Sequence, residues 1–251
     1  METSAAGCPI AAIICAAGNS SRMGKGKLKK EYRPLPGSNL TVLGQAVSAF
    51  AAIPQVKIIV IAVPDDPETG EAAARKILPQ ELFSENSDCE ICFITGGLTR
   101  RASVLNALSL LSEKSAGEPP RFVLIHDGAR PWVSESLILR TINALGNYPA
   151  VIPLLPLAET PKETDLPLDS NSPVFIKKHL KRVLTGTAQT PQGFAFPEIF
   201  VAHKKAALPE NLLSGEYTDD AEIWAAFFGS VAVIPGEAEN RKITFAEDIP
   251  C

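Results

Sequence analysis

The chain has 251 residues, of which 45% are hydrophobic and 21% are charged, a composition typical of soluble globular proteins. Its formal net charge of −4 gives no overall reason to expect binding to nucleic acid or to an anionic membrane, so any site for a polyanion has to be local. The longest apolar runs, Ile10–Ala17 and Ile58–Val63, are far shorter than the roughly 20 residues that cross a bilayer.

Along the first 154 residues, apolar segments alternate with segments that carry apolar residues every three or four positions. The expected strands are Ile10–Cys15, Lys57–Val63, Cys89–Thr95, Phe122–His126 and Ala150–Leu154. The expected helices are Thr41–Ile53, Glu68–Leu78, Thr99–Ser112 and Ser134–Leu145. Strands with so little polar alternation are typical of a parallel sheet that helices cover on both faces. The order therefore predicts an α/β fold with a doubly wound, mostly parallel sheet of the Rossmann type.

The following residues interrupt this alternation. Residues 155–185 are rich in proline and polar side chains and end in the basic run Lys177–Arg182, which predicts an arm or hairpin protruding from a single domain of residues 1–251. After the arm we expect, in order, a loop at Gly186–Phe194, helices at Phe196–Lys205 and Thr218–Phe228, and a late strand at Val231–Pro235.

The cysteines and the first residues bear on the compartment. Five cysteines are an odd number in a chain large enough to fold without disulfides, and Met1–Ser4 lack the basic flank of a signal or transit peptide. Cys89 and Cys92 belong to a predicted strand, which places their Cα atoms ~10 Å apart, whereas a disulfide needs about 7 Å or less. We therefore expect a cytoplasmic protein in which this pair is structural.

The first predicted strand leads directly into the small residues Ala16, Ala17 and Gly18. Ligands of open α/β sheets bind beyond the carboxyl ends of the strands, and small residues let backbone N–H groups approach phosphate oxygens. The spacing matches neither the G-x-G-x-x-G dinucleotide motif nor a P-loop. Taken alone, the turn is equally consistent with a simple tight connection.

A group of cations follows this turn. Arg22 and Lys30 bracket it and are expected to close over a triphosphate, where they would stabilise charge that develops on the phosphoryl oxygens. Lys25, Lys27 and Lys29 are expected on a solvated face instead.

Two further candidate segments follow the third and fourth strands. Gly97 allows close approach of the backbone and Ser103 is a candidate for reading a base edge, although a plain strand-to-helix turn capped by Thr99 is the alternative. Asp127 follows the fourth strand, where a hard oxygen ligand suits Mg²⁺ held jointly with nucleotide phosphates; capping of the next turn is the alternative. His126 is expected to be a packed residue and not a base.

Further motifs extend this pattern over nearly the whole chain. In chain order, the full set is Ala16-Ala17-Gly18 with Arg22-Met23-Gly24, Lys30-Glu31-Tyr32, Gly96-Gly97 with Arg100 and Ser103, His126-Asp127-Gly128-Ala129-Arg130-Pro131, Gln189-Thr190-Pro191-Gln192, Thr218-Asp219-Asp220 and Asn240-Arg241-Lys242-Ile243-Thr244. In this order, the motifs resemble those of the 2-C-methyl-D-erythritol 4-phosphate cytidylyltransferases of the non-mevalonate isoprenoid pathway.

The resemblance implies a nucleotidyltransferase that binds CTP, with Mg²⁺ as cofactor and a polyol phosphate as acceptor. The nucleotide would be held by Ala16, Ala17, Gly18, Gly97 and Ser103, and its phosphates would be neutralised by Arg22, Lys30 and Lys242. Asp127 would serve Mg²⁺ and the polyol, and the substrate pocket would be lined by Arg130 and Thr190.

The resemblance also implies a homodimer formed through the arm. In the family, a threonine and an arginine of the arm reach the neighbouring subunit's site, and Thr160 and Arg182 match those positions. Glu159 stands where the family usually has aspartate, and Leu98 replaces a frequent acidic residue beside the glycines.

We expect the acceptor phosphate to attack the α-phosphorus of CTP directly, because a phosphate monoester, with a second pKa of ~6, is already anionic at neutral pH and needs no general base. Ribitol 5-phosphate is the alternative acceptor, since cytidylyltransferases that use it share the same motifs. A non-catalytic nucleotide-binding module is the alternative from another class. A nicotinamide-dependent oxidoreductase would also suit the fold but lacks its glycine motif.

Overall fold

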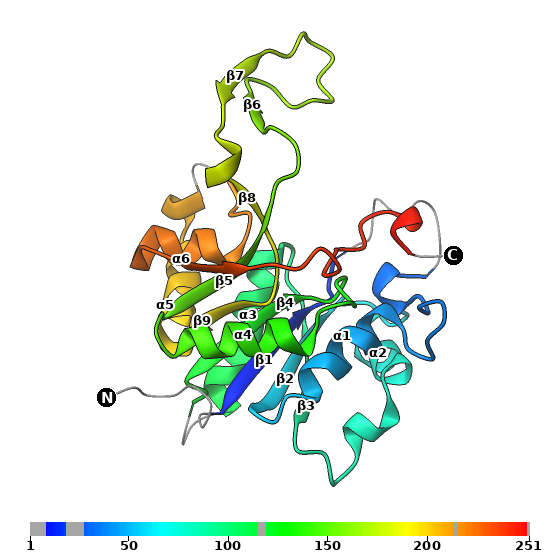
Figure 1. Cartoon of the computed structure of the whole chain (residues 1–251). Coiled ribbons are helices and arrows are strands. Elements are labelled where there is room, and N and C mark those ends of the chain that lie inside the picture. Colours follow the sequence, from blue (N-terminus) through cyan, green and yellow to red (C-terminus); the bar gives the residue numbers. More distant parts are fainter. Residues whose placement is uncertain (1–8, 19–27, 115–118, 213–214, 250–251) are drawn as a thin grey trace.

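A computed structural model describes residues 9–18, 28–114, 119–212 and 215–249. In these residues a central sheet of eight strands has the order β10-β5-β9-β4-β1-β2-β3, with β8 also paired to β5 (Figure 1). Its strands are β1 (Ile10–Cys15), β2 (Val56–Val63), β3 (Glu90–Thr95), β4 (Phe122–Asp127), β5 (Ala150–Pro156), β8 (Gly186–Ala188), β9 (Gln192–Ala195) and β10 (Ala232–Pro235).

The helices lie on both faces of this sheet. They are α1 (Val42–Ala51), α2 (Glu71–Ile77), α3 (Arg100–Lys114), α4 (Glu135–Leu145), α5 (Phe196–Ala206) and α6 (Asp220–Phe228). Four of them begin where the sequence supplies a side-chain cap: Thr41, Thr99, Ser134 and Asp219 each accept a hydrogen bond from a backbone N–H of the first turn.

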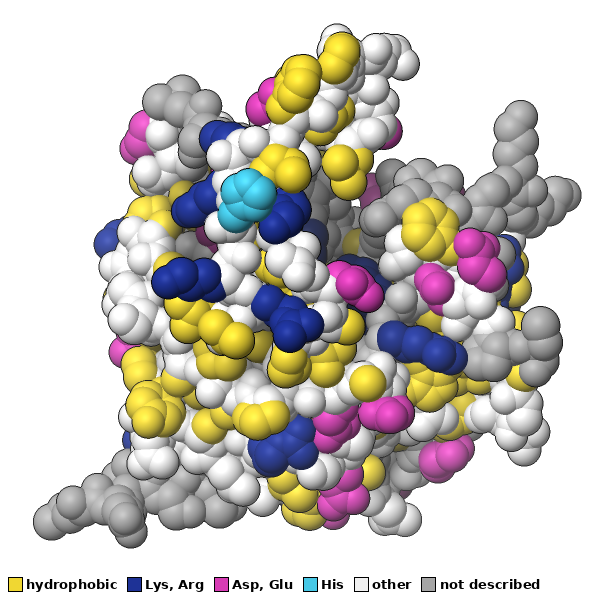
Figure 2. Space-filling model, turned by 45° about the horizontal axis from the view of Figure 1, so that its top comes forward, with side chains coloured by type: hydrophobic (Ala, Val, Ile, Leu, Met, Phe, Trp, Pro, Cys, Tyr) yellow, Lys and Arg dark blue, Asp and Glu magenta, His cyan; other side chains and the backbone are white. Residues whose placement is uncertain are grey.

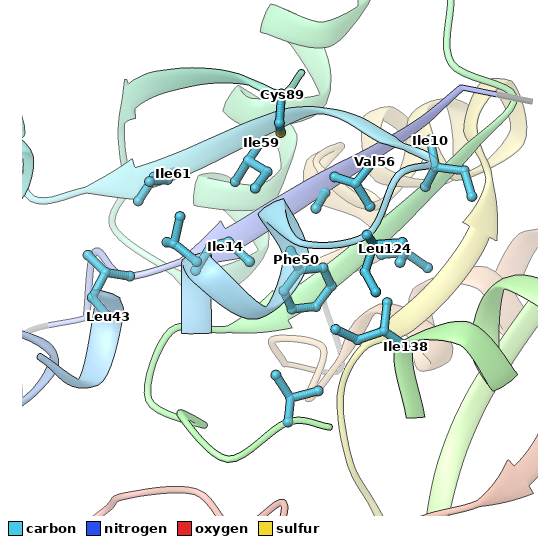
Figure 3. Packing of buried hydrophobic residues seen from close by; sticks show 14 of the residues in the cluster. Ile10, Ile14, Leu43, Phe50, Val56, Ile59, Ile61, Cys89, Leu124 and Ile138 are labelled. Carbon is cyan, nitrogen blue, oxygen red and sulfur yellow. The ribbon is translucent and has the colours of Figure 1, made fainter. Parts of the chain in front are cut away.

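The alternation of side chains along β1 explains the two layers of helices. Ile10, Ala12 and Ile14 point to one face and pack with α1 and α4. On this face, Phe50 of α1 and Ile138 of α4 lie close to Leu124 of β4 (Figure 3). Ala11 and Ile13 point to the other face and pack with α3, α5 and α6. Both faces of the strand are therefore buried, as its continuous apolar sequence predicts, and the doubly wound α/β fold is confirmed.

The prediction of a loop at Gly186–Phe194 is wrong. Residues 192–195 form β9, which lies between β4 and β5 and is antiparallel to both. The strand is short and contains Gly193, where a side chain would meet Leu145 and Thr141 at 2.9 Å. This central strand has no room for a side chain at Gly193, whereas a glycine in a sequence usually indicates a turn.

The arm protrudes between β5 and β8 (Figure 1). Its outer part is a two-stranded antiparallel hairpin, β6 (Lys162–Thr164) with β7 (Ile176–His179), followed by a short 3₁₀ turn at Arg182–Leu184. The predicted protruding arm is thus confirmed. In the described part of the chain, no helix is both long and apolar enough to cross a membrane.

Candidate active site

A cavity of about 320 Å³ lies at the carboxyl edge of the sheet, beyond the ends of β1, β3 and β4. The segments that form its wall are far apart in the sequence and meet because parallel strands end at the same edge. The lining residues are Cys15, Ala17, Gly18, Lys30, Glu31, Leu98, Thr99, Arg100, Ser103, Asp127, Ala129, Lys242 and Thr244.

The glycine turn after β3 packs against the small-residue turn after β1. A Cβ atom at Gly96 would overlap the Cβ of Ala17, so this position has no room for a side chain. Beyond it, Ser103 Oγ accepts a hydrogen bond from the N–H of Gly97 at 3.0 Å and donates to the carbonyl of Thr99 at 2.9 Å. Thr99 also caps α3 through the N–H of Ala102, as the alternative interpretation of this segment predicted.

Asp127, at the end of β4, is surrounded by three cations. Its carboxylate lies 3.0 Å from Lys242 Nζ, 3.4 Å from Arg130 Nε and 3.5 Å from Arg100 Nε. Burial alone would raise the pKa of Asp127, but the charges of Lys242, Arg100 and Arg130 outweigh it and hold the pKa well below its ordinary value. Asp127 is therefore a carboxylate at any physiological pH.

Arg100 connects this carboxylate to a second buried one. Its guanidinium donates to Asp220 at 2.6 Å, and Asp220 has no exposed surface. Burial raises the pKa of Asp220, but the Arg100 charge outweighs it and leaves the pKa at about 2. Arg100 is thereby held in the cavity wall by acids from β4 and α6.

The C-terminal segment supplies the opposite wall. Figure 1 shows this segment, in red, running from the orange-red strand β10 across the sheet edge towards the blue N-terminal part of the chain. The N–H of Ile243 donates to the carbonyl of Ala129 at 2.8 Å, and Lys30 Nζ donates to the carbonyl of Ile243 at 3.0 Å. Arg130 donates to the carbonyl of Asn240 at 2.7 Å. These contacts bring Lys242 and Lys30 to one cavity although more than 200 residues separate them.

His126 organises the backbone behind Asp127. The N–H of Asp127 donates to Thr190 Oγ1 at 3.2 Å, and Thr190 Oγ1 lies 2.9 Å from His126 Nδ1. Because His126 Nε2 faces the carbonyl of Arg130 at 3.1 Å, the ring donates from Nε2 and accepts the Thr190 hydroxyl at Nδ1. Burial lowers the pKa of His126 to about 4, so the ring is neutral, as expected of a packed residue.

Comparison with known proteins decides the family. The model of the family described as IspD, 2-C-methyl-D-erythritol 4-phosphate cytidylyltransferase, matches residues 10–251. The chain belongs to this family. The resemblance of the sequence motifs is thereby confirmed.

Similar curated proteins are bifunctional IspD/IspF enzymes. The chain is 38% identical over 241 residues to that of Bradyrhizobium sp. strain ORS 278, covering 95% of this chain and 54% of the relative. It is 35% identical over 244 residues to that of Brucella anthropi, covering 96% and 53%. The chain thus spans about half the length of these relatives.

Solved structures of the family share the fold. The 4-diphosphocytidyl-2C-methyl-D-erythritol synthase of Anaerococcus prevotii is similar at 28% identity and a TM-score of 0.74, with 97% of this chain and 93% of that chain covered. The 2-C-methyl-D-erythritol 4-phosphate cytidylyltransferase of Thermus thermophilus is similar at 26% identity and a TM-score of 0.66, with 94% of each chain covered.

The structure brings most of the predicted site residues together. Those that line the cavity are Ala17, Gly18, Lys30, Ser103, Asp127 and Lys242. Ala16, Arg130 and Thr190 lie just outside it: Ala16 is fully buried, Arg130 holds Asp127, and Thr190 holds the backbone of Asp127. Gly97 contributes its N–H to Ser103. Arg22, Lys25 and Lys27 lie outside the described residues.

The arm residues do not reach this cavity in their own chain. Thr160 and Arg182 are exposed, and Arg182 donates to the carbonyl of Ala158 at 2.8 Å. Their action on a neighbouring subunit stays a prediction.

Two features of the site differ from the sequence-based expectation or have no part in it. Lys29 was expected on a solvated face, but its side chain is only 5% exposed and lies 3.1 Å from Glu31, so this prediction is wrong. The roles of Arg100 and Asp220 were not assigned, although both lie in the motifs of the resemblance. Two opposite charges 120 positions apart carry no local signal that they will meet.

Proposed function

We propose that the chain transfers the cytidylyl group of CTP to 2-C-methyl-D-erythritol 4-phosphate and releases pyrophosphate. Family membership supports the reaction class. The observation that carries the proposal is the convergence of Lys30, Lys242 and Arg100 from three distant segments on one cavity, next to the carboxylate of Asp127. Because the net charge of the chain is −4, a triphosphate can be attracted only by a local concentration of positive charge such as this one.

In the proposed reaction an oxygen of the acceptor phosphate attacks the α-phosphorus of CTP in line. The new bond joins the two phosphoryl groups, and the bond between the α-phosphorus and its bridging oxygen breaks as pyrophosphate leaves. Lys30, Lys242 and, from the sequence, Arg22 would neutralise charge on the phosphoryl oxygens, and fixed cations in a partly buried cavity provide this stabilisation without reorganisation.

No side chain needs to act as a nucleophile in this scheme. The acceptor phosphate monoester, with a second pKa of ~6, is already an anion at neutral pH. Cys15 lines the cavity, but burial raises the pKa of its thiol to about 12, which keeps it protonated and unreactive. Both points favour direct transfer over a covalent enzyme intermediate.

We also propose Mg²⁺ as the cofactor, bound with the nucleotide. Mg²⁺ is commonly held by one or two carboxylates and the substrate phosphates, and Asp127 offers the carboxylate. Among the described residues no cluster of three or more Asp, Glu, His or Cys side chains is arranged to bind a metal, so the phosphates would supply most of the oxygen ligands. When bound, the ion would neutralise the departing pyrophosphate.

For the assembly we propose a homodimer through the arm. Exposed hydrophobic side chains gather there, including Leu168, Phe175, Val183 and Leu184, which are 66 to 86% exposed (Figure 2). Apolar side chains so exposed on a protruding element are typical of an interaction surface. In the dimer, Thr160 and Arg182 would contact the substrate phosphate in the partner's cavity. The free thiols of Cys15, Cys89 and Cys92 support a reducing compartment, for which we propose the cytoplasm.

The test is pyrophosphate release from CTP and Mg²⁺ in the presence of each polyol phosphate in turn. We expect release with 2-C-methyl-D-erythritol 4-phosphate and much less with ribitol 5-phosphate. Preference for ribitol 5-phosphate would change the acceptor and leave the chemistry intact. Absence of pyrophosphate with both acceptors, in a chain that still binds CTP, would favour the non-catalytic module.

A further inference from the structure

A buried ion pair lies beside the cavity, in the 3₁₀ turn at Lys30–Tyr32 and the residue before it. Lys29 Nζ is 3.1 Å from Glu31 Oε2, and the two side chains are 5% and 4% exposed. Burying two charges costs free energy that a packed apolar pair would not cost, so such a pair is weak evidence for stability. Its contacts suggest another role.

One end of the pair holds the turn after β1. Lys29 Nζ donates a hydrogen bond to the carbonyl of Gly18, eleven residues earlier, and Gly18 lies in the cavity wall directly beyond Ala17. The ammonium thus joins Gly18, in the turn after β1, to the start of the described segment that carries Lys30. Charge-assisted hydrogen bonds of this kind are stronger and better directed than neutral ones.

The other end of the pair faces Lys30. Glu31 Oε1 lies 4.0 Å from Lys30 Nζ, and Lys30 Nζ also donates a hydrogen bond to the carbonyl of Ile243. Lys29 and Glu31 neighbour Lys30 in its own segment, and the charged groups near it in the described part of the chain include Asp127 at the end of β4 and Lys242 and Asp248 in the C-terminal segment. One carboxylate is therefore shared between a lysine that holds the backbone turn and a lysine that lines the cavity.

We infer that Lys29 and Glu31 are positioning residues, which fix the Gly18 turn and the Lys30 ammonium relative to each other through the shared Glu31 carboxylate. This inference rests on the proposed function, because the two groups that they fix are proposed contacts of the triphosphate. Displacing a catalytic cation by about 1 Å can lower the rate on the order of 100-fold. Fixing the separation of the Gly18 turn and the Lys30 ammonium is therefore a reason to retain a buried ion pair whose burial costs free energy.

The first test uses Glu31→Gln, which keeps the shape of the side chain and removes its charge. We expect kcat for pyrophosphate release to fall about 10-fold or more, with a smaller change in the KM for CTP, because transition-state stabilisation by Lys30 is affected most. In a Lys30→Ala background the same change should alter kcat less than about 2-fold, since residues that act through one another do not give multiplicative losses.

The second test addresses Lys29. Lys29→Met should raise the KM for CTP, because the Gly18 carbonyl loses its donor, and Lys29→Arg should restore most of the loss by supplying another cationic donor. Lys114→Met is the matched control: it makes the same substitution in an ion pair with Glu90, away from the cavity, and should leave kcat and KM unchanged. Melting curves identify a variant that is unfolded at the assay temperature.

The outcomes separate this inference from the proposed function. If the parent chain releases pyrophosphate but the Glu31→Gln and Lys30→Ala losses multiply, Glu31 does not act through Lys30 and the inference is overturned alone. Unchanged kcat in Glu31→Gln would have the same meaning. If the parent chain releases no pyrophosphate, the proposed function fails, and the inference that rests on it fails with it.

Discussion

The edge of the sheet and the arm use charged residues in opposite ways. At the edge, Asp127 has three cations within 3.5 Å, and Asp220, which is fully buried, binds Arg100. On the arm, Lys177 and Glu163 form an ion pair whose side chains are 64% and 42% exposed. The charged side chains at the edge are held in place by buried ion pairs before a ligand binds. Exposed ion pairs such as the one on the arm contribute little to stability by themselves. The edge is thus suited to catalysis, and the arm to binding another surface.

The largest expected effect is at the edge. Lys30→Ala should lower kcat about 100- to 1,000-fold, because it removes one fixed donor to the transferred phosphoryl group, and Arg22→Ala should act in the same direction. Pyrophosphate release measures kcat, and circular dichroism checks that the fold is retained. Normal turnover in both variants would contradict the proposed mechanism.

The second expected effect concerns acid stability at the edge. His126 is buried and its folded-state pKa is about 4, against an ordinary value of 6.5. Between these values the unfolded chain binds a proton that the folded chain does not, so stability falls as the pH falls from about 6.5 to about 4, by up to about 3 kcal/mol.

Urea unfolding at several pH values measures this loss, and His126→Asn should remove this part of the pH dependence. His179→Asn, which changes an exposed histidine of β7, is the matched control and should unfold like the parent chain. An equally steep loss in the His126 variant would mean that other groups cause it.

A smaller effect is expected at the base of the arm. Arg182→Ala should raise the KM for the polyol phosphate about 10-fold while the KM for CTP stays within about 2-fold, as expected if one charge-assisted contact to the acceptor is lost. Steady-state kinetics with each substrate varied in turn measures this. Equal changes in both KM values would indicate that Arg182 acts on the whole site.

The smallest expected effect is on the free energy of unfolding of the monomer, which compares an exposed position of the arm with a buried position of the core. Val183→Ser should change the free energy of unfolding by no more than about 0.5 kcal/mol, since Val183 is 86% exposed. Val47→Ser in α1, a fully buried position, is the matched change in the core and should cost several times more. Analytical ultracentrifugation of the Val183 variant tests the dimer, which should weaken if the arm forms the interface.

The sequence allowed prediction of the elements whose signals are local. The bounds of β1 match the prediction at Ile10–Cys15, because an uninterrupted apolar segment before a small-residue turn marks both of its ends. Strand β9 could not be predicted, because its four residues form a strand only through pairing with β4 and β5. The same limit applies at the site: Asp127 was expected, but its cations come from α3 and the C-terminal segment as well as from its own turn.

Lys29 illustrates what charge patterns cannot reveal. A run of lysines usually lies on a solvated face, and nothing in the spacing separates Lys29 from its neighbours. Its burial depends on Glu31, two positions later, and on the Gly18 carbonyl, eleven positions earlier.

The placement of Ile243 and Lys242 has a consequence for the timing of synthesis. Strands β1 to β4 are complete by residue 127, yet the carbonyl that accepts from Lys30 and the ammonium beside Asp127 belong to residues translated more than 100 codons later. A nascent chain can therefore form half of the strands of the sheet early in translation, but the proposed active-site cavity closes only after residue 243 has emerged from the exit tunnel.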